Sequence, residues 1–163
     1  MQRLYEGVVA QARTPVFYQT FSVPDTLDGR FDMVVFHLWP VVDALRDEAG
    51  NISDDGQALF DIFVADMEGN LRTIGVGDTS FPKKMKAIGR SFYGRFDAYR
   101  TAHPDPEALA DVIARNVFDD GTEASDPRAA ALAHYGIAMR AAAGTVPTVA
   151  WPDPDMFVPK AAA

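Results

Sequence analysis

Few residues in this sequence could carry out chemistry. There is no cysteine, which excludes disulfides, thiolate metal sites and cysteine nucleophiles. The three histidines, His37, His103 and His134, stand far apart, and none lies four residues from another histidine or three residues from a glutamate, the spacings that helical metal sites use. His37 lies in an apolar segment, where a buried and hydrogen-bonded histidine is far more common than a metal ligand. The histidines therefore predict no metal site.

Two further patterns resemble functional sites but lack features that those sites require. Gly75–Asp78 resembles the start of a dinucleotide-binding loop, but it follows a predicted helix and lacks the third glycine. Asp54, Asp61 and Glu68 are spaced by seven residues and extend over about 21 Å of helix, so they cannot converge on one ion. No GK[ST] phosphate loop and no G-x-S-x-G nucleophile motif occurs. The sequence thus predicts no enzyme and no cofactor.

The most informative feature is a basic segment within an acidic chain. The 163 residues carry 23 acids against 15 lysines and arginines, a net charge of −8. Residues 78–100 contain six cations and two anions, a net charge of +4, so the rest of the chain sums to −12. The cations are Lys83, Lys84, Lys86, Arg90, Arg95 and Arg100.

Charge asymmetry of this kind bears on what a protein meets. A basic surface suits acidic loops of a partner protein, anionic lipid head groups or RNA. DNA is not expected, because the acidic total disfavours a general affinity for nucleic acid. The alternative is that this segment is simply a solvated helix beside acidic neighbours.

Helical periodicity predicts the elements that must position these cations. In Ser80–Arg100 the apolar residues recur every three or four positions and form one stripe: Phe81, Met85, Ile88, Phe92, Phe96 and Tyr99. A helix beginning at Ser53-Asp54, with Gln57 in capping-box position, precedes it. The expected buried residues of that helix are Leu59, Phe60, Phe63, Val64, Met67, Leu71 and Ile74. Since a short glycine loop joins the two helices, we expect them to pack antiparallel.

The remaining segments predict an all-α, single-domain bundle of six or seven helices. A long helix is expected from Leu27 to Ala49, begun by a Thr26 cap, bent at Pro40 and buried through Leu27, Phe31, Val34, Val35, Leu38, Val42 and Leu45. Shorter helices are expected at Arg3–Arg13, within Val16–Val23, at Ala108–Phe118 and at Arg128–Ala143. No segment alternates as a strand does.

The sequence divides into a helical domain, residues 1–144, and an extended proline-rich tail, residues 145–163. Trp151 and Phe157 in the tail predict either a strap laid over the body or a segment that waits for a partner. The longest apolar run, Met33–Val42, is far shorter than the roughly 20 residues that cross a bilayer, and no secretory signal is recognised. We therefore expect a cytoplasmic protein, in contact with the inner membrane only from its surface.

Three stretches together resemble a known family. They are VPDTLDGRFD at Val23–Asp32 running into HLW at His37–Trp39, LFDIFVADMEGNLRTIGVGD at Leu59–Asp78, and FYGRFDAY at Phe92–Tyr99. Their order and spacing resemble the ubiquinol–cytochrome c chaperone family, helical assembly factors of the cytochrome bc1 complex in mitochondria and α-proteobacteria. The resemblance extends from about Tyr5 to Phe118.

The resemblance implies a non-catalytic protein that holds newly made cytochrome b, or another bc1 subunit, until haem and partner subunits are added. It also implies contact with the ribosome or an anionic membrane surface, and with a second small assembly factor. The matched signature residues, expected to serve packing and capping, are Asp66, Arg72, Gly75, Gly77, Asp78, Tyr93 and Gly94. The residues expected to bind a partner are Lys83, Lys84, Lys86, Arg90, Arg95 and Trp151.

A second hypothesis stays open, that the bundle carries a small hydrophobic ligand such as quinone or lipid. It predicts a continuous apolar cavity of several hundred Å³. The residues expected to line that cavity are Phe63, Met67, Phe92 and Phe96.

Overall fold

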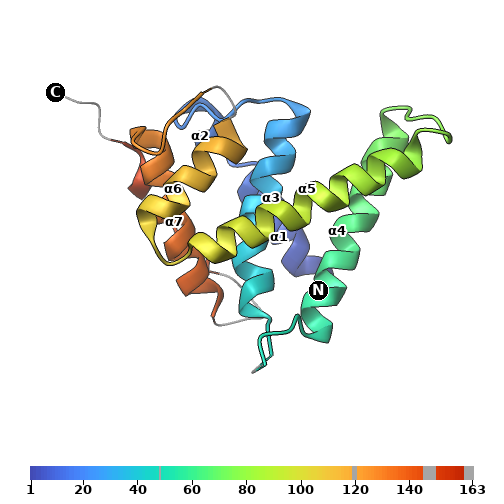
Figure 1. Cartoon of the computed structure of the whole chain (residues 1–163), viewed down its shortest axis with the longest axis horizontal. Coiled ribbons are helices and arrows are strands. Elements are labelled where there is room, and N and C mark those ends of the chain that lie inside the picture. Colours follow the sequence, from blue (N-terminus) through green and yellow to red (C-terminus); the bar gives the residue numbers. More distant parts are fainter. Residues whose placement is uncertain (48, 119–120, 145–149, 160–163) are drawn as a thin grey trace.

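The computed structural model describes residues 1–47, 49–118, 121–144 and 150–159. Over this part of the chain there are helices and no strands, apart from one isolated bridge between Arg46 and Ile52. The predicted all-α, single-domain bundle is therefore confirmed (Figure 1). The elements in order are α1 (Gln2–Ala12), α2 (Pro15–Gln19), α3 (Leu27–Ala44), α4 (Asp54–Thr73), α5 (Phe81–Ala102), α6 (Pro106–Ile113), the π-helical turn η1 (Ala114–Phe118), α7 (Pro127–Ala143) and the 3-10 turn η2 (Pro154–Phe157).

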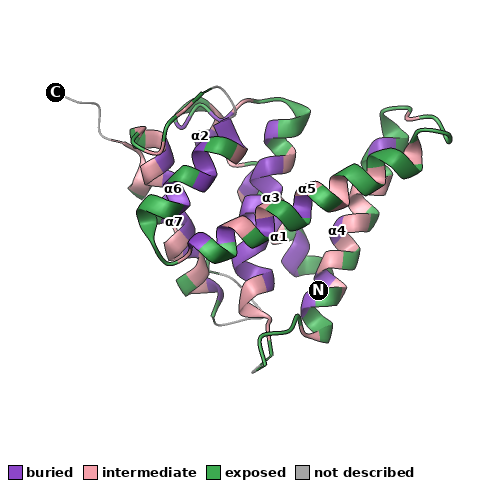
Figure 2. Cartoon of the chain, in the orientation of Figure 1, coloured by how far each residue is buried: buried purple, intermediate pink, exposed green. Residues whose placement is uncertain are grey.

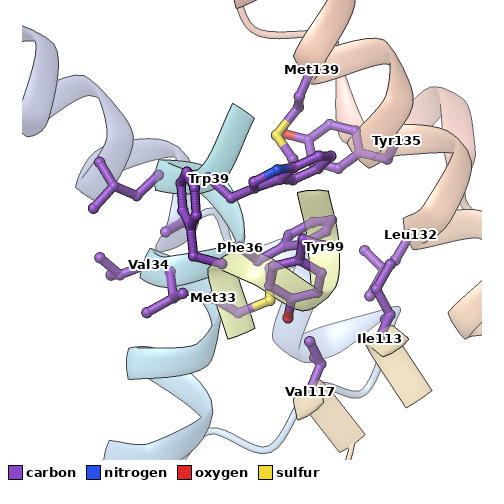
Figure 3. Close-up of a cluster of buried hydrophobic side chains, with 14 of the residues drawn as sticks. Met33, Val34, Phe36, Trp39, Tyr99, Ile113, Val117, Leu132, Tyr135 and Met139 are labelled. Carbon is purple, nitrogen blue, oxygen red and sulfur yellow. The ribbon is translucent and has the colours of Figure 1, made fainter. Parts of the chain in front are cut away.

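Helix α3 is the centre of the core. Every residue from Asp32 to Val42 is buried, as expected for a helix that is apolar on all sides. Helices α1, α5 and α7 pack around it, and Figure 3 shows Phe36 and Trp39 of α3 among side chains of α5, α6 and α7. Pro40 lies inside α3, which continues to Ala44, as the sequence predicted. No helix in the described ranges is both long and apolar enough to cross a membrane.

The helix starts follow the predicted capping chemistry, with one correction. Thr26 Oγ1 accepts a hydrogen bond from the Gly29 amide at 3.1 Å, as predicted for the start of α3. At α4, Ser53 is the N-cap and accepts from the Gly56 amide at 3.3 Å. The predicted capping-box role of Gln57 is wrong, because Gln57 lies one residue beyond the third helical position and donates to Asp61 instead.

Helix α3 ends at Ala44, five residues before the predicted end at Ala49. The chain instead forms a tight turn, in which the Asp47 carboxylate accepts from the Asn51 amide at 2.8 Å and the Asp47 amide donates to the Asn51 carbonyl. These local hydrogen bonds compete with continuation of the helix. Gly50 lies within this turn at φ +82°, a backbone conformation that glycine adopts readily.

Helices α4 and α5 form a helical hairpin whose connecting loop projects from the body (Figure 1). The helices run antiparallel, as predicted, and meet through Phe92 of α5, whose ring centroid lies 4.9 Å from those of both Phe60 and Phe63. At the loop, Gly75 has φ +79° and the Val76 amide donates to the Leu71 carbonyl at 3.1 Å. Figure 2 shows that much of the outer end of the hairpin is exposed.

The described part of the C-terminal tail lies against the body. The ring of Trp151 packs edge-on to His37 at 5.9 Å between centroids, and Phe157 packs against Tyr135 at 5.5 Å. Of the two alternatives for the tail, these contacts favour the strap. Residues 145–149 and 160–163 of the predicted tail fall outside the described ranges.

Candidate partner-binding surface

Four of the predicted partner-binding cations are free to meet a partner. Lys83, Lys84, Lys86 and Arg90 are exposed on α5, and within the described ranges none of them forms an ion pair. Their positive charges repel one another and lack local compensation, which makes this face attractive to an anionic surface. We call these four residues the basic face of α5.

The other two cations of α5 are neutralised by neighbours. Arg95 turns inward, where its Nε lies 2.8 Å from Asp32 Oδ1 and its guanidinium lies 5.7 Å from the centroid of the Phe31 ring. It also donates to Ser91 Oγ. Arg100 pairs with Asp97 at 2.7 Å on the surface. Arg95 thus joins α5 to α3, and whether it also binds a partner stays a prediction.

Next to the basic face, a groove of about 520 Å³ opens between the hairpin and the first half of α3. We call it the hairpin groove. Its walls are the residue that follows α1, the first two turns of α3, the second half of α4 with the residue after it, and α5 from Lys84 to Arg95. The lining residues are Arg13, Leu27, Asp28, Arg30, Phe31, Asp32, Val34, Asp66, Met67, Asn70, Leu71, Ile74, Lys84, Ala87, Ile88, Ser91 and Arg95.

The lips of the hairpin groove expose large apolar side chains on opposite walls. Leu27 of α3 is 62% exposed and Ile74 at the end of α4 is 54% exposed. The sequence predicted both residues to be buried, and both predictions are wrong. Each stands at a helix end, and because the hairpin diverges from α3 no described element covers either one. Exposed apolar residues beside a concave apolar floor are typical of protein interaction sites.

Four of the seven charged side chains that line the hairpin groove are held by a partner of the same chain. Asp66 accepts a hydrogen bond from Tyr5 Oη at 2.7 Å, Arg30 pairs with Asp25 at 2.6 Å, and Asp32 holds Arg95. The burial of Tyr5 and its contact with Asp66 raise the pKa of the phenol, so Tyr5 stays a donor at neutral pH. Four of the lining charges form no ion pair in the described ranges: Arg13, Asp28, Asp66 and Lys84.

A second, more polar cavity of about 420 Å³ lies on the other side of the α3 start. It shares Asp28, Asp32 and Arg95 with the hairpin groove, so the Asp32–Arg95 ion pair separates the two hollows. The rest of its lining is Pro24, Thr26, Gly29, Arg115, Asn116, Val117 and Phe118.

The sequence did not identify Asp32 as a site residue. Yet its ion pair with Arg95 links two of the three stretches that carry the family resemblance. Asp32 is the last residue of VPDTLDGRFD, and Arg95 lies in FYGRFDAY. The signal that could have found it is a single acid at the start of a long apolar run, since a buried carboxylate requires a cation.

Two signature residues serve packing and two serve the loop. Asp66 anchors Tyr5 of α1, and the Arg72 guanidinium lies 5.0 Å from the centroid of the Phe81 ring across the loop. Gly75 supplies the positive φ, and the Gly77 carbonyl accepts from the Ser80 amide at 3.0 Å and from the Phe81 amide. These positions hold the hairpin loop in shape.

The other three signature residues, Asp78, Tyr93 and Gly94, lie at exposed positions. Asp78 is exposed, and Tyr93 is 53% exposed although its ring lies 5.3 Å from that of Phe60. Gly94 is exposed, and a methyl group added there would find no neighbouring atom within 4 Å. They lie on the outer side of α5 or its loop, where a partner could contact them.

His37 has the structural role that the sequence predicted. It is fully buried, and its Nδ1 donates to the Met33 carbonyl at 2.8 Å, which leaves Nε2 to accept from Tyr135 Oη at 3.2 Å. Tyr135 Oη in turn accepts from Gln11 Nε2 at 2.9 Å. Burial lowers the pKa of His37 to about 4, so the imidazole is neutral at pH 7. Trp151 packs against His37 and is half-buried. Its predicted role in binding a partner stays a prediction.

The place predicted for a cavity that holds a small hydrophobic ligand is filled by side chains, and the hairpin groove lies elsewhere. The rings of Phe63, Phe92 and Phe96 pack on one another, with centroids 4.9 and 5.7 Å apart, and do not line the hairpin groove. Of the four residues expected to line the cavity, only Met67 lines the groove. The apolar interior between α4 and α5 is therefore filled by side chains.

Comparison with known proteins gives two findings. A sequence profile of the family described as "Ubiquinol-cytochrome C chaperone" matches residues 19–150. The solved structure described as "Crystal structure of the Cbp3 homolog from Brucella abortus" is 33% identical to this chain, covers 94% of this chain and 89% of its own, and superposes with a TM-score of 0.80. Among curated protein sequences, none matches significantly.

Proposed function

Because the chain belongs to the ubiquinol–cytochrome c chaperone family, we propose that it is an assembly factor of the cytochrome bc1 complex that binds newly made cytochrome b. The observation that carries the proposal is the juxtaposition of the apolar hairpin groove with the basic face of α5. A subunit that spans a membrane exposes long apolar segments before assembly, and a binding surface with an apolar floor and charged edges can cover one reversibly.

The proposed role is non-catalytic. In support, polar groups on the first half of α3 and on α4 are held by partners of their own chain, as Asp32 is by Arg95 and Asp66 is by Tyr5. Groups held in this way position helices and leave none poised as a nucleophile with an adjacent base. The protein acts through its shape and charge.

The basic face of α5 is proposed to contact acidic loops of the client, and it can also meet the anionic surface of the membrane or the ribosome from which the client emerges. The proposed location is the cytoplasmic face of the inner membrane, with contact only at the membrane surface. A second small assembly factor is a further proposed partner.

Deleting the gene tests the function. We expect the deletion strain to lose most of its bc1 complex and the associated cytochrome b absorbance, while other membrane cytochromes persist. A normal bc1 content in that strain would contradict the proposal.

Charge reversal tests the surface. Lys83→Glu combined with Lys86→Glu should reduce recovery of cytochrome b in a pull-down several-fold, since it places like charges against an acidic client. The matched control reverses two exposed cations on other elements, Arg3→Glu with Arg115→Glu, and should leave recovery unchanged. Equal recovery with both double variants would rule out the basic face.

A further inference from the structure

We propose that the hairpin groove binds a single apolar helical segment of the client, two to three turns long, that carries acidic side chains beside its apolar anchors. This inference rests on the proposed function, since it names the part of the client that the groove receives. The contacts, dimensions and charges of the groove carry it.

The dimensions of the hairpin groove fit a short helix. Along α4 the lining extends from Asp66 to Ile74, a rise of about 12 Å, and along α5 from Lys84 to Arg95, a rise of about 16 Å. A helix of two to three turns has the same length and offers anchors at positions i, i+3 or i+4, and i+7. These anchors would contact the floor formed by Phe31, Val34 and Met67.

The exposed lips favour a polypeptide over a small ligand. Leu27 and Ile74 stand on opposite walls and are each more than half exposed, so an occupant must reach above the floor to remove them from water. A helix with its side chains is about 10–12 Å across and can touch both lips at once. An acyl chain or a quinone ring lying on the floor would leave the side chains of Leu27 and Ile74 exposed to solvent.

The cations in and beside the hairpin groove favour a client segment that carries acidic side chains. Arg13 and Lys84 line the hairpin groove and form no ion pair in the described ranges. Of the two lining acids without an ion pair there, Asp66 is held by the Tyr5 hydroxyl and Asp28 stands at the start of α3. Lys83, Lys86 and Arg90 add positive charge along the adjacent face of α5. A glutamate or aspartate next to the apolar anchors would pair with Arg13 or Lys84 and raise the association rate.

The test uses the full chain and two fluorescent peptides of about 15 residues, near the length at which helices become stable in water. Both peptides have the same leucine- and alanine-rich apolar face; one is flanked by glutamates and the other by lysines. Fluorescence anisotropy should show that the glutamate peptide binds at least about tenfold more tightly than the lysine peptide. Equal affinities, or no binding of either peptide, would overturn the inference.

Two sets of variants locate the binding. Leu27→Ser with Ile74→Ser should weaken binding of the glutamate peptide about tenfold or more, while Met156→Ser, at an apolar residue that is 80% exposed outside the groove, should not change it. Lys84→Glu should narrow or reverse the preference between the two peptides, whereas Arg115→Glu should leave it intact. A folding defect would weaken both peptides alike, so loss of the preference identifies a direct contact.

Other occupants give different outcomes. If decylubiquinone or phosphatidylglycerol micelles bind the wild-type chain and the Leu27→Ser/Ile74→Ser variant abolishes that binding while neither peptide binds, the groove holds a small amphiphile and the inference fails. If the chain forms a dimer that the same variant dissociates, the occupant is a second copy and the inference also fails. A bc1 defect in the deletion strain without peptide binding would overturn the groove inference while leaving the proposed function in place.

Discussion

Arg95 differs from Lys83, Lys84, Lys86 and Arg90 of α5 because its charge is paired with a buried carboxylate, that of Asp32. Its ion pair with Asp32 is 2.8 Å long and largely shielded, with side-chain exposures of 23% and 8%. Removing one member of such a pair leaves the other charge poorly solvated, which is much more costly than losing a surface pair. Asp32 therefore contributes to the stability of the fold and to the wall between the two hollows.

We expect Asp32→Asn to lower the free energy of unfolding by about 2–3 kcal/mol, because it leaves the Arg95 guanidinium without its counter-charge. Urea denaturation measures the change. The matched control is Asp97→Asn, which breaks the exposed pair with Arg100 and should cost less than about 1 kcal/mol. Equal losses for the two variants would mean that the Asp32–Arg95 pair is no more than a surface contact.

His37 makes stability depend on pH. Its folded-state pKa, about 4, lies below the ordinary value of 6.5, so the folded protein favours the neutral imidazole. This contribution is fully present above pH 6.5 and is lost as the pH falls toward 4, because the unfolded chain takes up the proton first. The loss reaches about 2 kcal/mol at pH 5 and about 3 kcal/mol at pH 4.

The His37 prediction is checked by urea denaturation of the wild type and of His37→Gln at pH 7, 5.5 and 4.5. The glutamine keeps a polar side chain beside Met33 and Tyr135 but does not titrate. The variant should therefore lose less stability than the wild type between pH 7 and pH 4.5. Carboxylates titrate equally in both proteins and cancel in the comparison. Parallel pH profiles would show that His37 is not buried as a neutral group.

Among the elements, two glycines test how α3 and α5 are built. A methyl group at Gly29 would lie 2.0 Å from the Pro24 carbonyl oxygen, where the chain turns into α3. Gly94, in the middle of α5, has no atom near that position. The first glycine is required by a close approach of the backbone, and the second only weakens its helix.

We therefore expect Gly29→Ala to destabilise the protein by more than about 2 kcal/mol and Gly94→Ala to stabilise it by about 0.5–1 kcal/mol. Thermal unfolding followed by circular dichroism gives both values. Similar effects of the two substitutions would contradict this account of the α3 start. A stabilised Gly94→Ala variant that binds its client poorly would indicate that the glycine serves close approach of a partner.

The elements also show what sequence reasoning reached and what it missed. Helix identities, the Thr26 cap and the burial of α3 follow from periodicity and local chemistry, and the structure confirms them. The predicted burial of Leu27 and Ile74 is wrong because periodicity identifies the apolar stripe of a helix but not how far along it the neighbouring helices pack. The Asp32–Arg95 pair joins residues 63 positions apart, which no local pattern encodes.

The molecule as a whole is polarised. Its net charge of −8 coexists with a basic face on α5, and the α4–α5 hairpin carries that face, part of the apolar groove and three of the exposed large apolar residues: Ile74, Tyr93 and, at its base, Ile52. The opposite half, built by α6, α7 and the tail, is closed by packing of Phe157 on Tyr135. In the proposed function, the side with the basic face and the groove receives the partner, while the other side holds the fold together.

The central claim, that cytochrome b is received at the hairpin groove, is tested most directly by photo-crosslinking in cells. A photoreactive side chain is placed on the groove wall by Ala87→p-benzoylphenylalanine and, as control, on the exposed surface of α6 by Glu107→p-benzoylphenylalanine. The account predicts an adduct with newly made cytochrome b from position 87 and little or none from position 107. Adducts of equal yield from both positions, or from position 107 alone, would contradict it.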